Sequence, residues 1–392
     1  MKIGVPREIV PGEKRVALVP DVAARLTKGG HEVVVEMHAG ERAGFTDAAY
    51  QAAGAKIAPD ATALYAQAEV VLKVQRPTYN DALAQHEVDL MRSGTALIGF
   101  LQPRNDAELL ARLAERGVTS FAMELVPRIT RAQMMDALSS QSTVAGYKAA
   151  LLAANAVGRF FPLLMTAAGT IRPARVLVIG AGVAGLQAIA TARRLGAVVE
   201  AFDTRPVVKE QVQSLGASFV ELEVSADEAQ DAGGYAKELA EEHIRREKAL
   251  IHQHASEADA VITTALVPGR RAPVLITADT VKAMKHGSAI VDLAAEQGGN
   301  CELSVPGETV VKHGVTIVAP LHLPSELAYD ASSMYARNVA ALLAHLAPQG
   351  TLALDLTDEI TRATCVTAHG EVLLDRPAAA AAGAARAQEA KV

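Results

Sequence analysis

The feature that most constrains this chain is a glycine-rich turn that follows an apolar strand and opens a helix. Residues 175–179 read RVLVI, residues 180–185 read Gly-Ala-Gly-Val-Ala-Gly, and a helical pattern continues to residue 195. In such a unit the first glycine permits the tight turn, the second lets the backbone approach a pyrophosphate, and the third lets helix and strand pack closely. The turn therefore predicts a doubly wound α/β domain with a dinucleotide site.

The same turn supplies the first candidate cofactor-binding residues. Phosphates would lie at the N-terminus of the helix, where unpaired N–H groups and the helix dipole favour an anion. The residues expected to bind a dinucleotide there are Gly180, Gly182, Val183, Ala184 and Gly185. The alternative is a tight turn without a nucleotide, but the flanking strand, helix and acidic residue favour binding.

That acidic residue is Asp203, at the end of the next predicted strand and close to the ~20 residues beyond the last glycine that are typical of a ribose-binding acid. A carboxylate there accepts a hydrogen bond from a free 2′-hydroxyl and repels a 2′-phosphate, so it selects NAD over NADP. We include the neighbouring Thr204 and Arg205 in the site. Arg205 leaves an alternative open, because a nearby arginine can accommodate the 2′-phosphate.

Short runs rich in β-branched residues alternate with helical-period segments over most of the 392 residues. The first round includes strands at residues 2–5, 31–36 and 96–99, and a second round follows an Ala-rich helical stretch at residues 143–159. Because right-handed crossovers place helices on both faces of a parallel sheet, this alternation predicts an α/β fold. We expect two doubly wound parallel-sheet (Rossmann-like) domains with a cleft between them.

The first domain is predicted to be discontinuous. Its strands end early, so the last part of the chain is expected to return and complete it. The first domain then comprises residues 1–137 and 316–376, including a strand at 316–318. The inserted NAD-binding domain comprises residues 138–315. Residues 377–392, mostly alanine, are expected to form a disordered tail.

Two further segments of the second domain are candidates for the cofactor site. Thr264, Ala265 and Leu266 end a predicted strand at the carboxyl edge, where open α/β sheets bind ligands, although an ordinary loop start explains them as well. The long, loosely patterned segment around Gly234 and Tyr235 is either a lid over the site or a solvated helical hairpin without a role.

A polar segment at residues 127–143 lies between two apolar stretches. If residues 131–137 are helical, Gln133 and Asp136 share a face, and Arg128 can pair with Asp136. A guanidinium and an amide would then be fixed near a bound ring. The alternative is a helix N-cap, for which the candidates are Ser139, Ser140, Ser142 and Thr143.

Composition excludes several classes of function. A formal net charge of −6, 4% aromatic residues and no tryptophan argue against nucleic-acid binding. The only cysteines, Cys301 and Cys365, are too far apart in sequence to suggest a thiolate metal site, and no metal site is predicted. The chain shows neither a signal peptide nor an apolar run of membrane-spanning length, so we expect no direct membrane insertion.

Several segments together resemble the soluble NAD(H)-binding domain of proton-translocating nicotinamide nucleotide transhydrogenases, which forms the beginning of their alpha subunit. The resemblance extends over about residues 1–375 and is most specific in RITRAQMMDALSSQSTVAGYKA; other matching segments read ARVLVIGAGVAGLQAIATARRLGAVV, AGGYAKE, VITTALVPGRRAPVLIT, VDLAAEQGGNC and VVKHGV. The same superfamily contains alanine dehydrogenases.

Two positions separate the two activities. Alanine dehydrogenases resemble this chain at Arg15 and Lys73, but they also use a catalytic His where this chain has Gln102 and an Asp where it has Glu296. A glutamine cannot act as a general acid or base near neutral pH. Arg15 and Lys73 are then expected to be surface or salt-bridge residues without a catalytic role.

The resemblance implies that this chain binds NAD(H) and that NADP(H) is bound by a partner subunit, with hydride passing directly between the two. It places the nicotinamide near Arg128, Gln133, Asp136 and Ser139, which are the implied catalytic residues. It also implies a homodimer attached to the cytoplasmic face of the inner membrane through a membrane subunit. The alternatives are a soluble amino-acid dehydrogenase and a non-catalytic NAD sensor.

Overall fold

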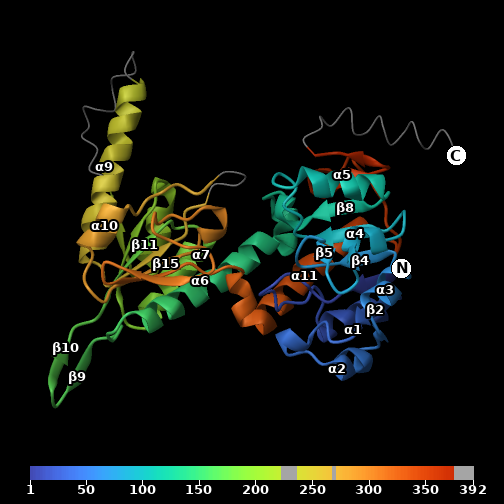
Figure 1. Ribbon diagram of the computed structural model, residues 1–392, viewed down its shortest axis with the longest axis horizontal. Helices are drawn as coiled ribbons and strands as arrows, with labels where there is room; N and C mark the ends of the chain where they lie inside the picture. The colour runs from blue at the N-terminus through green and yellow to red at the C-terminus, as the bar shows by residue number, and fades with distance from the viewer. Residues whose placement is uncertain (222–235, 267–270, 375–392) are drawn as a thin grey trace. The chain divides into compact units, whose positions relative to one another are not determined.

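The computed structural model describes residues 1–221, 236–266 and 271–374, with only the backbone described at residues 236–243. The chain divides into two compact units (Figure 1). The first comprises Met1–Gln141 and the chain from Pro324 onward, and the second comprises Ser142–Leu323. Each unit contains one large, mostly parallel sheet, which confirms the predicted fold class.

The first unit contains an eight-stranded sheet in the order β19-β18-β8-β7-β4-β1-β2-β3. The strands from β8 to β3 are parallel, whereas β18 and β19 run antiparallel to their neighbours. The strands are β1 (Lys2–Val5), β2 (Glu32–Glu36), β3 (Lys56–Ala58), β4 (Val70–Leu72), β7 (Ala96–Gly99), β8 (Thr119–Ala122), β18 (Cys365–Ala368) and β19 (Glu371–Val372). A separate two-stranded ribbon is formed by β5 (Tyr79–Asn80) and β6 (Gln85–His86).

Short helices cover this sheet, and several begin at side-chain caps. Asp60 accepts a hydrogen bond from the Ala63 N–H (2.8 Å), and Asp106 accepts one from the Leu109 N–H (3.0 Å), which satisfies backbone donors at those helix starts. The helices are α1 (Pro20–Lys28), α2 (Asp47–Ala52), α3 (Ala61–Tyr65), α4 (Glu87–Leu90), α5 (Ala107–Glu115), α11 (Ala328–Leu346) and α12 (Glu359–Thr364). The 3₁₀ turns are η1 (Glu41–Ala43), η2 (Met123–Leu125), η3 (Thr130–Met135) and η6 (Leu323–Leu327).

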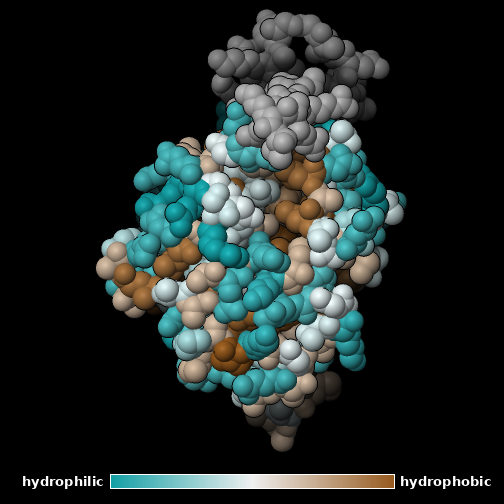
Figure 2. Space-filling view, turned by 90° about the vertical axis from the view of Figure 1, so that its right-hand side faces the viewer, coloured by the Kyte–Doolittle hydropathy of each residue, from teal (hydrophilic) through white to brown (hydrophobic). Residues whose placement is uncertain are grey.

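The core of the first unit lies on both faces of its sheet. Along β4, Val70 and Leu72 belong to one buried apolar cluster and Val71 to another, because successive side chains of a strand point to opposite faces. Figure 2 shows the side of the molecule that lies to the right in Figure 1. Hydrophilic residues cover most of that surface, and hydrophobic ones appear in small separate patches.

The second unit contains a seven-stranded sheet in the order β13-β12-β11-β14-β15-β17-β16, of which only β16 is antiparallel. The strands are β11 (Arg175–Ile179), β12 (Val198–Phe202), β13 (Ser218–Val220), β14 (Ala260–Thr263), β15 (Ala289–Asp292), β16 (Thr309–Lys312) and β17 (Val315–Val318). The antiparallel pair β9 (Leu164–Thr166) and β10 (Gly169–Ile171) forms a hairpin that projects from the body of this unit (Figure 1).

The helices of the second unit lie on both faces of this sheet (Figure 1). They are α7 (Val183–Arg194), α8 (Lys209–Ser214), α9 (Ala236–Glu257) and α10 (Ala278–Ala283), with the 3₁₀ turns η4 (Pro206–Val208) and η5 (Ala295–Gln297). The long helix α6 (Ala137–Ala156) begins in the first unit and continues into the second.

The strand expected at residues 316–318 is present, but the prediction that it completes the first domain is wrong. It forms β17, which pairs in parallel with β15 through Ile317 and Ile290. The strand from the returning chain that does join the first sheet is β18, beside β8. The tail at 377–392 and the proposed lid residues Gly234 and Tyr235 lie outside the described residues.

Candidate functional site

The glycine turn lies between β11 and α7, at the carboxyl end of the sheet of the second unit. The strand order reverses between β11 and β14, which is the place where open α/β sheets bind ligands. Gly180 has φ +95°, a conformation that favours glycine, and a Cβ there would lie 2.6 Å from Oγ1 of Thr264. That hydroxyl donates a hydrogen bond to the Gly180 carbonyl (2.9 Å), so the turns after the two strands support each other.

The other two glycines differ in what surrounds them. A Cβ at Gly185 would lie 1.8 Å from the Gly180 carbonyl oxygen, so this glycine is required for close packing within the turn. A Cβ at Gly182 would have no atom of the described chain within 4 Å. Gly182 therefore faces open space at the start of α7, beside the exposed Val183. The turn is packed on its protein side and open where a phosphate would approach.

Helix α6 packs closely against the start of α7. A Cβ added at Gly146 of α6 would lie 2.1 Å from the carbonyl oxygen of Ala184, so only glycine permits this approach. Gly146 was not among the predicted site residues. The closeness of two helices depends on tertiary packing, and no local sequence pattern marks it.

Asp203 follows β12 and turns its carboxylate toward the glycine turn. Its Oδ2 accepts a hydrogen bond from the Ala181 N–H (2.7 Å), and its Oδ1 accepts one from the Arg205 N–H (2.9 Å). The Arg205 guanidinium adds two more, from Nε to Oδ1 and from Nη2 to Oδ2, each 2.9 Å. Although partial burial would raise it, the pKa of Asp203 is lowered, because the guanidinium and the backbone N–H groups favour the ionised carboxylate.

The loop after β14 carries the other predicted residues, Thr264, Ala265 and Leu266. Ala265 is held on both sides by the buried Asn300, which accepts from its N–H (3.0 Å) and donates to its carbonyl (2.9 Å). Leu266 is 46% exposed.

Asn300 is itself positioned by Asp292, at the end of β15. The buried carboxylate of Asp292 accepts hydrogen bonds from Thr263 Oγ1 (3.0 Å), the Asn300 N–H (3.1 Å) and Ser304 Oγ (2.7 Å). Sequence reasoning missed both Asp292 and Asn300 as residues that shape this loop. Their signal was present, since polar side chains directly after a buried strand lie at the ligand-binding edge.

In the first unit, the polar segment has a different local structure from the one hypothesised. Residues Thr130–Met135 form the 3₁₀ turn η3, so Gln133 and Asp136 do not share a face of an α-helix. Asp136 instead caps α6, where it accepts hydrogen bonds from the N–H (2.9 Å) and hydroxyl (2.6 Å) of Ser139. The N-cap alternative is therefore correct in kind, but the capping residue is Asp136 rather than a serine or threonine.

The segment is anchored from α11 and leaves several side chains exposed. Asn338 donates to the Met134 carbonyl (2.8 Å) and accepts from the Ser140 hydroxyl (2.7 Å). Arg128 and Gln133 are exposed, and Met134 is 76% exposed. Within the described chain, the expected ion pair between Arg128 and Asp136 does not form. Arg131 of the same segment does pair, with Asp358 (2.7 Å).

The two residues shared with alanine dehydrogenases are buried, so the expectation of surface residues is wrong. Arg15 binds Glu13 through two hydrogen bonds, from Nε (2.8 Å) and Nη2 (2.6 Å). Although burial opposes it, these bonds lower the pKa of Glu13 to about 2. Lys73 lies 2.7 Å from Glu87 and 3.4 Å from Glu8. Both cations are therefore neutralised by glutamates of the same chain.

The positions that differ from alanine dehydrogenases are exposed. Gln102 has φ +50°, and its backbone N–H donates to the carboxylate of Glu124. Glu296 is 45% exposed and accepts a hydrogen bond from the His322 N–H (2.6 Å). Gln102 and Glu296 lie in different units.

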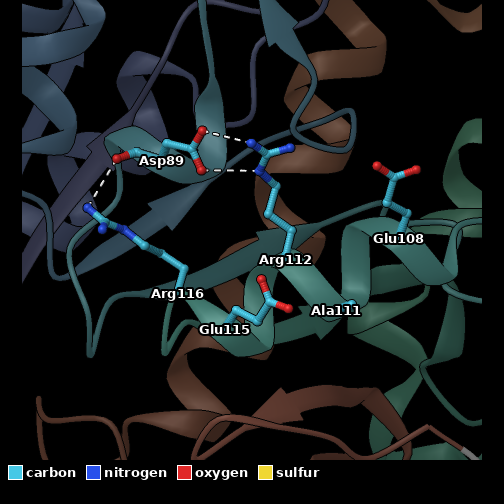
Figure 3. Close-up of a pocket in the computed structure, with 6 residues that line it drawn as sticks. All are labelled: Asp89, Glu108, Ala111, Arg112, Glu115 and Arg116. Atoms are coloured by element: carbon cyan, nitrogen blue, oxygen red, sulfur yellow. Dashed lines mark hydrogen bonds and ion pairs between the residues drawn. The ribbon is translucent and has the colours of Figure 1, made fainter.

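A surface hollow on α5, of about 480 Å³, is closed chemically by its own charges (Figure 3). Arg112 binds the carboxylate of Asp89 through Nε (3.1 Å) and Nη2 (2.9 Å), and Arg116 donates to the Asp89 and Met91 carbonyls. Glu108 and Glu115 line the rest. Because both arginines in its described lining are engaged, this hollow offers no free cation to a ligand.

No helix within residues 1–221, 236–266 and 271–374 is both long and apolar enough to span a membrane.

Comparison with known proteins gives two family matches that together span nearly all of the chain. Residues 4–145 match the N-terminal domain of the alanine dehydrogenase/PNT family, and residues 149–375 match its C-terminal domain. A Rhodospirillum rubrum protein, the first of the separate parts of an NAD(P) transhydrogenase subunit alpha, is 50% identical over 379 residues, covering 95% of this chain and 98% of that protein.

Solved structures agree. The crystal structure of transhydrogenase from Sinorhizobium meliloti superimposes with a TM-score of 0.85 at 43% identity, covering 95% of this chain and 100% of that one. An L-alanine dehydrogenase superimposes with a TM-score of 0.79 at 29% identity, covering 98% and 99%. The resemblance identified from sequence motifs is confirmed.

Proposed function

The chain belongs to the alanine dehydrogenase/PNT family, and from this premise we propose that it is the NAD(H)-binding component of a proton-translocating NAD(P) transhydrogenase. In this role it passes hydride directly between NADH and NADP⁺ bound on a partner subunit. One observation favours this over amino-acid dehydrogenation. The exposed Gln102 stands where a dehydrogenase has its catalytic His, so no general base is available at that position.

The second unit suits a dinucleotide. The open backbone at Gly182 and the start of α7 would hold the pyrophosphate, and Asp203 would accept from a ribose hydroxyl. Val183, Ala184, Thr204 and the loop of Thr264, Ala265 and Leu266 would line the site. NAD(H) supplies the hydride chemistry, and the chain supplies binding and orientation.

Hydride transfer between two nicotinamides needs no proton to be removed, so positioning is the main catalytic task. We assign that task to Arg128, Gln133, Asp136 and Ser139, following the family resemblance. Asp136 and Ser139 are held by the helix cap, whereas Arg128 and Gln133 are exposed and available to a cofactor or partner. Gly234 and Tyr235 would belong to a lid that excludes water.

The proposed assembly contains a second copy of this chain, an NADP(H)-binding subunit and a membrane subunit that attaches the complex to the cytoplasmic face of the inner membrane. The name of the Rhodospirillum rubrum relative describes one portion of an alpha subunit, which supports a system whose components are separate chains.

The test is a reconstitution. The purified chain is mixed with the NADP(H)-binding subunit of the same system, and reduction of an NAD analogue by NADPH is followed optically. We expect transfer only when both proteins are present. Controls with L-alanine plus NAD⁺, and with pyruvate, ammonia and NADH, should show no turnover. Turnover with L-alanine at ordinary enzyme rates, about 1 to 10³ per second, would replace this proposal with the dehydrogenase alternative.

A further inference from the structure

The carboxylate of Asp203 is saturated by its own chain. A carboxylate offers about four lone-pair positions. Here Oδ1 accepts from the N–H and the Nε–H of Arg205, and Oδ2 accepts from the Ala181 N–H and from Nη2 of Arg205. The Asp203 side chain is only 6% exposed in this arrangement, whereas that of Arg205 is 56% exposed.

The four donors are of two kinds. The N–H groups of Ala181 and Arg205 belong to the backbone and fix the carboxylate at the edge of the glycine turn. The two guanidinium bonds come from an exposed, flexible side chain, and they occupy the positions from which a ribose hydroxyl would have to donate. A hydroxyl can therefore reach Asp203 only after the guanidinium has left.

We propose that the Arg205 side chain is a latch that covers the ribose-binding carboxylate of Asp203 and must turn outward to admit the adenosine ribose of NAD(H). This inference rests on the proposed binding of NAD(H) by the second unit. The latch competes with the ligand for one carboxylate, so it lowers NADH affinity. It is distinct from a phosphate-binding arginine, which would raise NADPH affinity.

The latch makes a signed prediction for Arg205→Ala. Removing the guanidinium leaves Asp203 held by two backbone N–H groups and open to the ribose, so NADH should bind roughly two- to fivefold more tightly, the range expected for an exposed ion pair. NADPH should not bind more tightly, because the uncovered carboxylate repels its 2′-phosphate. The difference between the two proteins in NADH affinity should shrink in 1 M salt, which screens the ion pair.

The experiment titrates the full chain with NADH and with NADPH by ligand fluorescence, at low and high salt. Arg194→Ala, which removes another exposed arginine of the same unit, is the matched control and should change neither affinity. Thermal melting confirms that each variant is folded. Tighter NADH binding by Arg205→Ala alone, with the expected loss of the gap in salt, supports the latch.

Other outcomes overturn it. An unchanged or weaker NADH affinity in Arg205→Ala would mean that the guanidinium does not compete with the ribose. A selective loss of NADPH affinity would identify a phosphate-binding arginine, and equal tightening of both cofactors would exclude a ribose-specific effect. Failure of the unmutated chain to bind NADH would overturn the proposed function as well, and so separates the two.

Discussion

Glu8 is a fully buried carboxylate with an incomplete set of partners. Its Oε1 accepts from the Val74 N–H (2.6 Å), and its Oε2 lies 3.4 Å from the Lys73 ammonium but accepts no hydrogen bond within the described chain. Glu87 competes for the same ammonium at 2.7 Å. Burial raises the pKa of Glu8 to about 7, even though Lys73 opposes the shift. The native state therefore retains a proton that an unfolded chain releases near pH 4.5.

This difference predicts a pH-dependent gain from Glu8→Gln. Between about pH 4.5 and 7 the unfolded state binds fewer protons at this site than the native state, so native stability falls as pH rises. Glutamine removes that linkage while keeping the shape. The stability of the variant relative to the unmutated protein should rise by roughly 2–3 kcal/mol from pH 4.5 to 7.5, measured by urea unfolding. Glu115→Gln, at an exposed position, is the control and should show a flat difference. A flat difference for Glu8→Gln would mean that Glu8 is ionised in the native state throughout.

Gln133 and Asp136 call for separate tests, because only one of them also supports a helix. Gln133→Ala should leave stability within about 0.5 kcal/mol and NADH affinity within a few fold, yet reduce hydride transfer to the NADP-bound partner at least tenfold. Asp136→Ala should also cost about 1 kcal/mol of stability through the lost cap, and Asp136→Asn should recover much of that cost. Gln51→Ala, at an exposed site on α2, is the control for transfer. Unimpaired transfer in Gln133→Ala would remove this residue from the proposed machinery.

At the scale of elements, the strand–turn–helix unit of the second domain is the region that sequence predicted best. A run of buried residues from Val176 to Ile179, three glycines and a helical pattern are local features, and together they define where the backbone must turn. The same unit separates two uses of glycine. Gly185 allows close packing within the turn, whereas Gly182 faces open space.

The glycines therefore form a matched pair of variants. Gly185→Ala places a Cβ against the Gly180 carbonyl and should cost roughly 1–3 kcal/mol or more of stability, seen in thermal or urea unfolding. Gly182→Ala meets no described atom, and its φ of −76° suits any residue, so stability should stay within about 0.5 kcal/mol. Its methyl group would instead meet the pyrophosphate, so NADH binding should weaken at least tenfold. Normal NADH binding by a folded Gly182→Ala protein would contradict the proposed phosphate position.

Elements whose place depends on distant partners are harder to predict. The strand at Val315–Val318 is evident from its residues, but its neighbour is not, because any apolar strand fits either sheet. Sequence alone does not identify Asp136 as the capping residue, because the serines that follow it also suit a cap. A lysine such as Lys73 is expected near the surface, and only the fold shows that two glutamates from other segments bury and neutralise it.

At the scale of the whole molecule, the two units use the same topological position differently. The strand order of the first sheet reverses between β1 and β4, and that of the second between β11 and β14. In the second unit the position carries the open glycine turn. In the first, Glu8 and Lys73 follow the two central strands and fill it with a buried ion pair. The sheet edge that would bind a ligand is thus retained in one unit and occupied by protein charges in the other.

The β9–β10 hairpin is the feature that bears on assembly. Phe160 and Leu163 precede it and are each 55% exposed, and Met165 on β9 is 80% exposed. A projecting apolar segment of this kind marks a protein contact, and the proposed homodimer is the assembly that would cover it in every copy. A hollow of about 610 Å³, lined by Phe160 and Ile171 among others, lies beside it and could receive apolar side chains from a second chain.

We therefore expect the unmutated chain to sediment at twice its 41.0 kDa at micromolar concentration, and Met165→Asp to shift it toward the monomer. A buried aspartate without a partner would weaken the interface by several kcal/mol, whereas on the free hairpin it is solvated and leaves the unfolding temperature nearly unchanged. Val311→Asp, on the edge strand β16 with 66% of its surface exposed, adds the same charge away from the hairpin and should remain dimeric. A monomeric unmutated protein would remove the homodimer from the proposed assembly, and a dimer that tolerates Met165→Asp would place its interface elsewhere.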